Sequence, residues 1–90
     1  MLSNYKTTIT SDAAATIIVT YCNTQIVRVN NDGTVTLNTG GYETVTTKKK
    51  MNQAAKQFGL GYSVSQRASR WYVSKPDGNE VVLESNSLTF

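Results

Sequence analysis

The sequence contains no histidine and only one cysteine, Cys22. An internal disulfide is therefore impossible, and a zinc site would have to rely on carboxylates and a single thiolate. We expect neither a metal nor a cofactor. Cys22 follows Tyr21 in an apolar run, which is more typical of a small half-buried hydrophobic residue than of a reactive thiol.

Long hydrophobic runs are also missing. The longest apolar stretch, residues 13–19, is interrupted by Thr16 and is far shorter than a membrane span of roughly 18 residues. Residues 1–10 contain Lys6 as their only cation and no apolar segment of the kind found in signal peptides. We expect no membrane partner and a cytoplasmic location. The 90 residues fit a single domain, 1–90, with one modest core.

Acidic residues are absent from residues 44–76, which contain seven Lys and Arg residues. The formal net charge of +3 therefore conceals a local charge of +7. Residues 77–90 contain three acidic residues and no basic ones. Such segregation indicates association with an anionic partner, although it says nothing about the fold.

Thirteen threonines, many alternating with Val, Ile or Leu, favour β structure. We predict strands at residues 5–10, 16–22, 25–29 and 34–38, with an Asp-Gly turn before the last of them. From residue 47 to 58 the period becomes helical, because Met51, Ala54, Ala55 and Phe58 fall at i, i+3, i+4 and i+7. Thr46 or Thr47 would cap this helix, and Gly59 would end it.

A hairpin is predicted beyond the helix, with strands at 62–67 and 70–74 around Ala68 and Ser69. The run Lys75-Pro-Asp-Gly78 then turns the chain into a strand at 80–84, and residues 85–90 form a candidate flexible tail. This order predicts an α+β fold, with an antiparallel sheet of about six strands and one amphipathic helix packed on it. The expected core is Ile17, Val19, Val27, Val29, Val35, Leu37, Met51, Ala55, Phe58, Val64, Trp71, Val73, Val81 and Leu83.

The predicted helix begins with Lys48, Lys49 and Lys50. A helix start favours acidic residues, because its exposed N–H groups act as a partial positive charge. A bound phosphate or carboxylate would make the three lysines favourable there. The alternative is a solvated lysine face that contributes only to solubility.

A polar helix face is predicted opposite the apolar stripe, formed by Lys49, Asn52, Gln53 and Lys56. Asn and Gln can form paired hydrogen bonds to adenine and Lys can hold phosphate, so this face could lie in a major groove. No preceding helix suggests a helix-turn-helix, and a plainly solvated face is the competing interpretation.

The hairpin places Arg67 opposite Arg70, on the same face as Tyr72. Directly opposed like charges are destabilising, which indicates either an anion between the two side chains or a longer loop. With Lys75, these residues complete the predicted partner-binding surface. The carboxylates show no pairing suited to acid–base catalysis, so we do not expect an enzyme.

The segment from Thr34 to Gln53 runs through a Gly-Gly-aromatic step into a Thr-Thr-Lys-rich helix. With Phe58 to Val64 and Trp71-Tyr-Val73, it resembles small uncharacterised proteins of tailed bacteriophages over about half of the chain. The resemblance implies a phage origin, expression in the bacterial host cytoplasm and a compact domain. It transfers no activity and no site residues.

Two functions fit these observations. The first is nucleic-acid binding, with the lysines and arginines on phosphates and an affinity that falls steeply with salt. The alternative is a protein-directed inhibitor of a host or defence system, similar in role to an anti-CRISPR protein, that binds an acidic or nucleic-acid-binding surface of its target. A homodimer could also form through an edge strand at residues 5–10 or 80–84.

Overall fold

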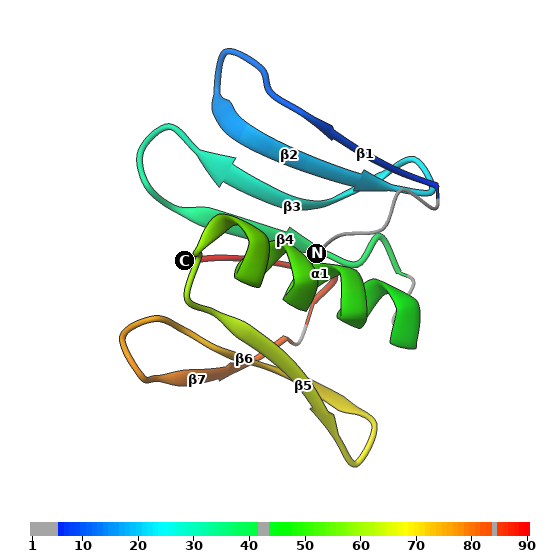
Figure 1. The fold of residues 1–90 in the computed structure, drawn as a ribbon. Coiled ribbons are helices and arrows are strands. Elements are labelled where there is room, and N and C mark those ends of the chain that lie inside the picture. Colours follow the sequence, from blue (N-terminus) through cyan, green and yellow to red (C-terminus); the bar gives the residue numbers. More distant parts are fainter. Residues whose placement is uncertain (1–5, 42–43, 84) are drawn as a thin grey trace.

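The computed structural model describes residues 6–41, 44–83 and 85–90. One helix, α1 (Val45–Phe58), separates two groups of strands along the chain (Figure 1). The strands are β1 (Thr7–Thr10), β2 (Ala15–Tyr21), β3 (Thr24–Asn30), β4 (Val35–Asn38), β5 (Ser63–Arg67), β6 (Arg70–Ser74), β7 (Glu80–Val82) and β8 (Ser87–Thr89).

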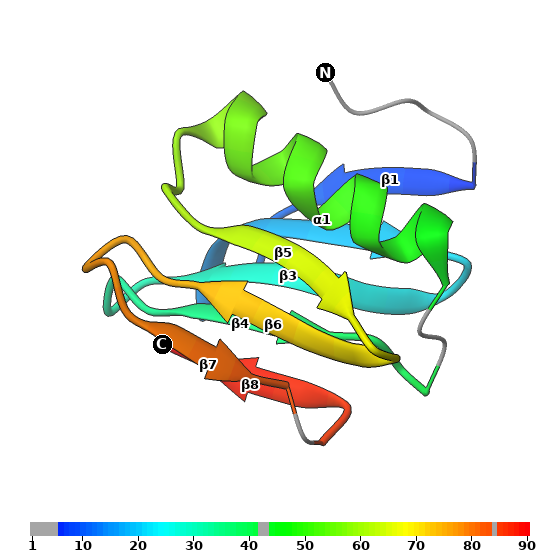
Figure 2. The ribbon, with the colours of Figure 1, turned by 90° about the horizontal axis from the view of Figure 1, so that it is seen from below.

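The strands form two antiparallel sheets. The larger has the order β1-β2-β3-β4-β8 and the smaller β5-β6-β7. Helix α1 contacts β3 of the larger sheet and β5 of the smaller one, and Figures 1 and 2 show it running alongside both sheets. The predicted α+β class with one helix is confirmed, although the described strands number eight and belong to two sheets instead of one.

The core lies where the helix meets both sheets. Most predicted core residues are buried there, but Ile17, Val29, Phe58 and Val81 are only half-buried. Ile26 was not predicted, because strict alternation would turn it outward from Val27. A β-bulge between the pairs Val19–Val27 and Thr20–Gln25 removes that alternation, and Ile26 is buried beside Val27.

The helix begins earlier than predicted. Thr44 is the N-cap, and its Oγ1 accepts a hydrogen bond from the Thr47 backbone N–H at 3.2 Å. The prediction of a cap at Thr46 or Thr47 was therefore wrong by two or three residues. At the other end Gly59 is confirmed as the C-cap, with φ 65° and a hydrogen bond from its N–H to the Ala55 carbonyl.

The end of the chain is a strand, not the flexible tail considered for residues 85–90. β8 pairs with β4, which places Leu88 opposite Leu37. Phe90 exchanges two backbone hydrogen bonds with Val35, and its ring packs edge-on against Tyr62 at 5.8 Å between centroids. No local pattern predicted this strand, because its partner β4 lies about fifty residues earlier.

The predicted hairpin is confirmed, since Arg67 pairs with Arg70 around the two-residue loop Ala68-Ser69. Both loop residues have positive φ, 50° and 66°. This is the backbone shape of a type I′ turn, which matches the twist of the strands but usually requires Asn or Gly. The next strand, β7, is shorter than the predicted 80–84, and Glu84 lies outside the described residues.

We predict that Ser69→Gly stabilises the protein. A non-glycine residue in the left-handed region costs about 1 to 2 kcal/mol, whereas the added flexibility of glycine costs about 0.5 to 1 kcal/mol. Chemical denaturation should therefore show a gain of about 0.5 to 1 kcal/mol in unfolding free energy. Ser63→Gly, the same change at an exposed position of β5, should be destabilising; a loss of stability in both variants would contradict the strain at Ser69.

Candidate functional site

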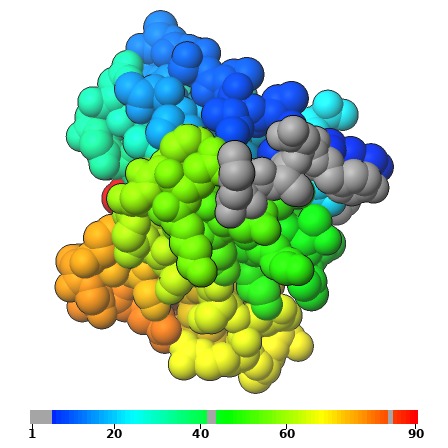
Figure 3. Space-filling view, in the orientation of Figure 1, coloured from blue at the N-terminus to red at the C-terminus, as the bar shows by residue number. Residues whose placement is uncertain are grey.

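The start of α1 and the tip of the β5–β6 hairpin lie at the same end of the molecule in Figures 1 and 2. In the space-filling view, the green start of the helix adjoins the yellow hairpin tip (Figure 3). Lys49 and Arg70 are exposed and Lys48 is half-buried. These three cations, from two elements, are called the basic end below.

None of the three cations of the basic end forms an ion pair within residues 6–41, 44–83 and 85–90. They occupy the second turn of the helix and the edge of the hairpin loop. The partial positive charge of a helix start fades beyond the first turn, so Lys48 and Lys49 are not destabilised there. The helix dipole therefore gives no argument for a bound anion beside Lys48 and Lys49.

The sequence predicts that Lys50 belongs to an exposed lysine cluster, and this prediction is wrong. Lys50 is 3% exposed, and its Nζ lies 5.2 Å from the centroid of the Tyr21 ring. The reason is helical spacing, because the buried face of α1 begins at Thr47 and repeats at Lys50, Met51, Ala54 and Ala55. Only two of the three consecutive lysines thus remain for an external partner.

Asn52 was predicted as a nucleic-acid contact, but its amide is bound within the protein. Its Nδ2 donates to the Val64 carbonyl at 2.9 Å, and its Oδ1 accepts from the Val64 N–H at 2.7 Å. The side chain therefore replaces a neighbouring strand along the free edge of β5. On the rest of that face, Gln53 is half-buried and Lys56 is exposed in the last turn.

Arg67 has a charge partner that the sequence did not reveal. Its Nη2 donates to Oε1 of Glu80 on β7, and its guanidinium carbon lies 4.1 Å from the centroid of the Tyr72 ring. The predicted opposition of Arg67 and Arg70 is confirmed. However, Glu80 supplies the counter-charge, so this pair gives no evidence for a bound anion.

Lys75 lies away from the basic end. It follows β6 in the turn to β7, which Figures 1 and 2 place at the opposite end of the hairpin from its tip. Its Nζ is 3.6 Å from Oδ2 of Asp77. Lys75 is thus locally paired and is not brought together with Lys49 or Arg70.

Three aspartates lie in the turns at that opposite end: Asp12 between β1 and β2, Asp32 between β3 and β4, and Asp77 between β6 and β7. A hydrogen bond to each carboxylate lowers its pKa below the usual 3.8. The donor is the Ala14 N–H for Asp12, the Thr34 hydroxyl for Asp32 and the Asn79 N–H for Asp77. Two of these aspartates are ion-paired, Asp12 with Arg28 and Asp77 with Lys75. The aspartate turns are therefore largely neutralised, whereas the basic end is not.

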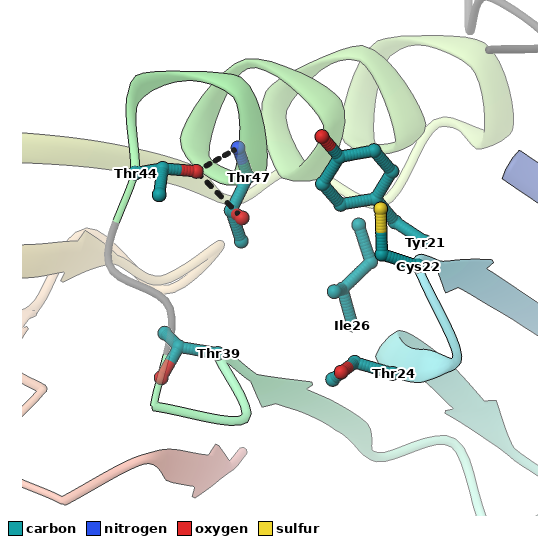
Figure 4. A pocket seen from close by; sticks show the side chains of 7 residues that line it. All are labelled: Tyr21, Cys22, Thr24, Ile26, Thr39, Thr44 and Thr47. Carbon is teal, nitrogen blue, oxygen red and sulfur yellow. Dashed lines mark hydrogen bonds between the residues drawn. The ribbon is translucent and has the colours of Figure 1, made fainter. Parts of the chain in front are cut away.

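A pocket of about 320 Å³ lies near the helix start. Figure 4 shows its lining from the end of β2, the beginning of β3, the segment after β4 and the first turn of α1. Four threonine side chains form much of its wall, and the hydroxyls of Thr44 and Thr47 are 3.0 Å apart. The remaining lining residues are Tyr21, Cys22 and Ile26. No sequence pattern predicts this pocket, because its wall combines four separate segments of the chain.

No three His, Cys, Asp or Glu residues of the described ranges gather where they could hold a metal ion. No helix found there is both long enough and apolar enough to cross a membrane.

The fold and the basic end define a small α+β protein with three cations gathered at one end. The chain belongs to the family of Kyanoviridae Gp96 proteins, whose model matches residues 1–88, and it is thus a small phage protein. The phage origin implied by the sequence resemblance is confirmed. No curated protein and no solved structure matches the chain.

We predict that Asn52→Ala destabilises the protein by about 2 kcal/mol, because it leaves the N–H and carbonyl of Val64 without partners. Gln53→Ala is the matched control: this neighbouring amide is also half-buried. It should change the unfolding free energy by less than about 0.5 kcal/mol. Equal effects of the two substitutions in urea denaturation would contradict a specific role for Asn52.

We also predict a loss of stability in acid that depends on the three turn aspartates. Their pKa values are lowered in the folded state, so their contribution is complete above the usual 3.8 and disappears as the pH falls through the lowered values. Asn retains an oxygen acceptor but does not titrate. Thermal melts from about pH 7 to about pH 2 should therefore show a weaker pH dependence for the triple variant Asp12→Asn, Asp32→Asn, Asp77→Asn. Parallel curves for the variant and the wild type would refute this assignment.

Proposed function

We propose that this phage protein is a non-enzymatic binding protein that contacts nucleic acid through its basic end. The observation that carries the proposal is that the start of α1, with Lys48 and Lys49, and the hairpin tip, with Arg70, lie at the same end of the molecule. Lysine and arginine side chains bind phosphates without regard to sequence. The binding is therefore expected to be electrostatic. Its expected location, the host cytoplasm, follows from the resemblance to phage proteins.

Arg67 and Tyr72 extend this surface along the outer face of the smaller sheet. The guanidinium stacks on the Tyr72 ring, which remains half-buried. An aromatic ring beside cations suits an unpaired base whose phosphates lie on neighbouring lysines and arginines. Ser63 and Ser65 flank this region without adding charge. Because the Arg67 guanidinium already covers one face of the Tyr72 ring, a base would stack on that guanidinium, next to the phosphate contacts.

The test is binding of labelled single-stranded and double-stranded DNA and RNA, measured by fluorescence anisotropy over a series of salt concentrations. We expect affinity at low salt and a log–log salt slope of roughly −2 to −3, from about three phosphate contacts. The double variant Lys49→Gln, Arg70→Gln should reduce the steepness of the slope by about 1 to 2.

The matched control is Lys56→Gln, Lys75→Gln, which removes the same formal charge away from the basic end. It should retain most of the wild-type affinity. Equal losses in the two double variants would show that only net charge matters and would overturn the assigned surface. Absence of nucleic-acid binding at low salt would reject the proposal and favour an acidic protein surface as the partner.

A further inference from the structure

The pocket beside the first turn of α1 takes no part in the phosphate contacts of the basic end. Its volume is about 320 Å³, and its described lining residues include no charged side chain. An apolar cavity of about 150 Å³ holds one benzene ring, so this pocket has room for roughly two fused rings. A charged group would lose its hydration there without a counter-charge from the described lining. The pocket therefore suits an uncharged ring system.

The two sides of the pocket differ in chemistry. Ile26 is 1% exposed and Tyr21 is half-buried, so the strand side offers aliphatic and aromatic surface for a flat ring. Figure 4 shows that the helix supplies the hydroxyls of Thr44 and Thr47 on the other side. A small number of polar groups on an apolar wall is typical of sites that orient a small molecule.

The hydroxyls of this pocket retain hydrogen-bonding capacity. Thr44 Oγ1 accepts from the Thr47 N–H at 3.2 Å and lies 3.0 Å from Thr47 Oγ1. The two hydroxyls carry two hydrogens, and their mutual bond uses one of them. The second hydrogen and the Thr24 hydroxyl enter no hydrogen bond with residues 6–41, 44–83 or 85–90. A hydroxyl both donates and accepts, so these groups match a ring edge that carries both kinds of partner.

Lys48 connects the pocket with the basic end. Its N–H donates to the Thr44 carbonyl at 3.1 Å, so Lys48 lies one helical turn beyond Thr44. Side chains of a helix lean towards its N-terminus, which directs the half-buried Lys48 towards the level of Thr44. A ring in the pocket that carries a phosphate outside it would therefore meet this cation. An uncharged ring joined to an anionic backbone is the chemistry of a nucleotide.

We propose that this pocket binds one uncharged purine base. Two sources share this chemistry: a free nucleoside, and an unpaired base of a strand whose phosphates lie on the basic end. Only the second source rests on the proposed function. A base within a double helix is not a source, because it is stacked and its hydrogen-bonding edge is occupied.

Occupancy of the pocket can be measured through Cys22, the only cysteine, which lines the pocket and is exposed. The rate of its alkylation by iodoacetamide should fall several-fold with saturating adenosine or with a short single-stranded oligodeoxyadenylate. Ribose, and an abasic strand of the same length, should leave the rate unchanged. Protection by adenosine alone would identify a free nucleoside as the source, and protection by the oligonucleotide alone would identify a base of a strand. Absence of protection by both, or equal protection by the abasic strand, would overturn the proposal.

A filled pocket provides the second test. Thr47 is 1% exposed, and Thr47→Leu places a larger apolar side chain in the pocket while favouring the helix. We expect this variant to fold, to lose the protection by adenosine and to bind the oligodeoxyadenylate about tenfold more weakly. Its salt slope should be unchanged, because the phosphate contacts remain. Thr46→Leu is the matched control at a neighbouring exposed position outside the pocket lining, and it should bind as the wild type does.

The failure of this inference differs from the failure of the proposed function. Equal oligonucleotide affinity of Thr47→Leu and the wild type, without protection by adenosine, would refute the pocket and leave the basic end intact. Absence of nucleic-acid binding would refute the basic end, whereas adenosine protection that Thr47→Leu abolishes would still support the pocket. Circular dichroism melts check that both variants fold. The alkylation test uses the wild type and does not depend on them.

Discussion

The two hydrogen bonds between the Asn52 side chain and the backbone of Val64 connect the helix to the smaller sheet. Close by, the buried Tyr62 hydroxyl donates to the Met51 carbonyl at 2.6 Å, and burial raises the pKa of that hydroxyl. Together these bonds fix β5 alongside α1. Since β5 is the first strand of the hairpin, they also determine where Arg67 and Arg70 lie.

Chain length explains why the hairpin tip reaches the start of the helix. The 14 residues of α1 span about 21 Å and the five residues of β5 about 17 Å. The chain reverses through Gly59 and Gly61, both with positive φ, so that β5 runs back beside α1. The far end of β5 therefore lies beside the beginning of the helix. The basic end is thus a consequence of topology and of matched element lengths.

The elements with strong local signals were predictable from the sequence. Apolar spacing gave the helix, and the hairpin loop followed from the two strands around Ala68-Ser69. Position 50 was misassigned because a lysine was assumed to face solvent, whereas helical spacing from Thr47 turns it inward. Ile26 was missed because a bulge is not visible in an alternating pattern. The strand β8 was missed because it is three residues long and pairs with distant β4.

The location of the candidate site was predicted better than its composition. The charge run at residues 44–76 identified the segment, but the roles of individual residues depended on partners from elsewhere in the chain. Glu80 neutralises Arg67 across the smaller sheet, and Val64 engages Asn52 from the following strand. Such contacts between elements cannot be derived from composition or spacing. Lys48, Lys49 and Arg70 remain from the original set as cations of one shared surface.

The cations of the basic end have no described ion pair, whereas two of the three turn aspartates are paired with Arg28 and Lys75. The helix start is therefore the more positive end of the molecule. Near a polyanion, this asymmetry would exert a torque that turns the helix start towards the polyanion before contact. The longest extent of the molecule is 35 Å, several times the Debye length of about 8 Å at physiological salt. The distant aspartates are therefore screened while the leading cations are not, and the molecule would be oriented only within the last nanometre of approach.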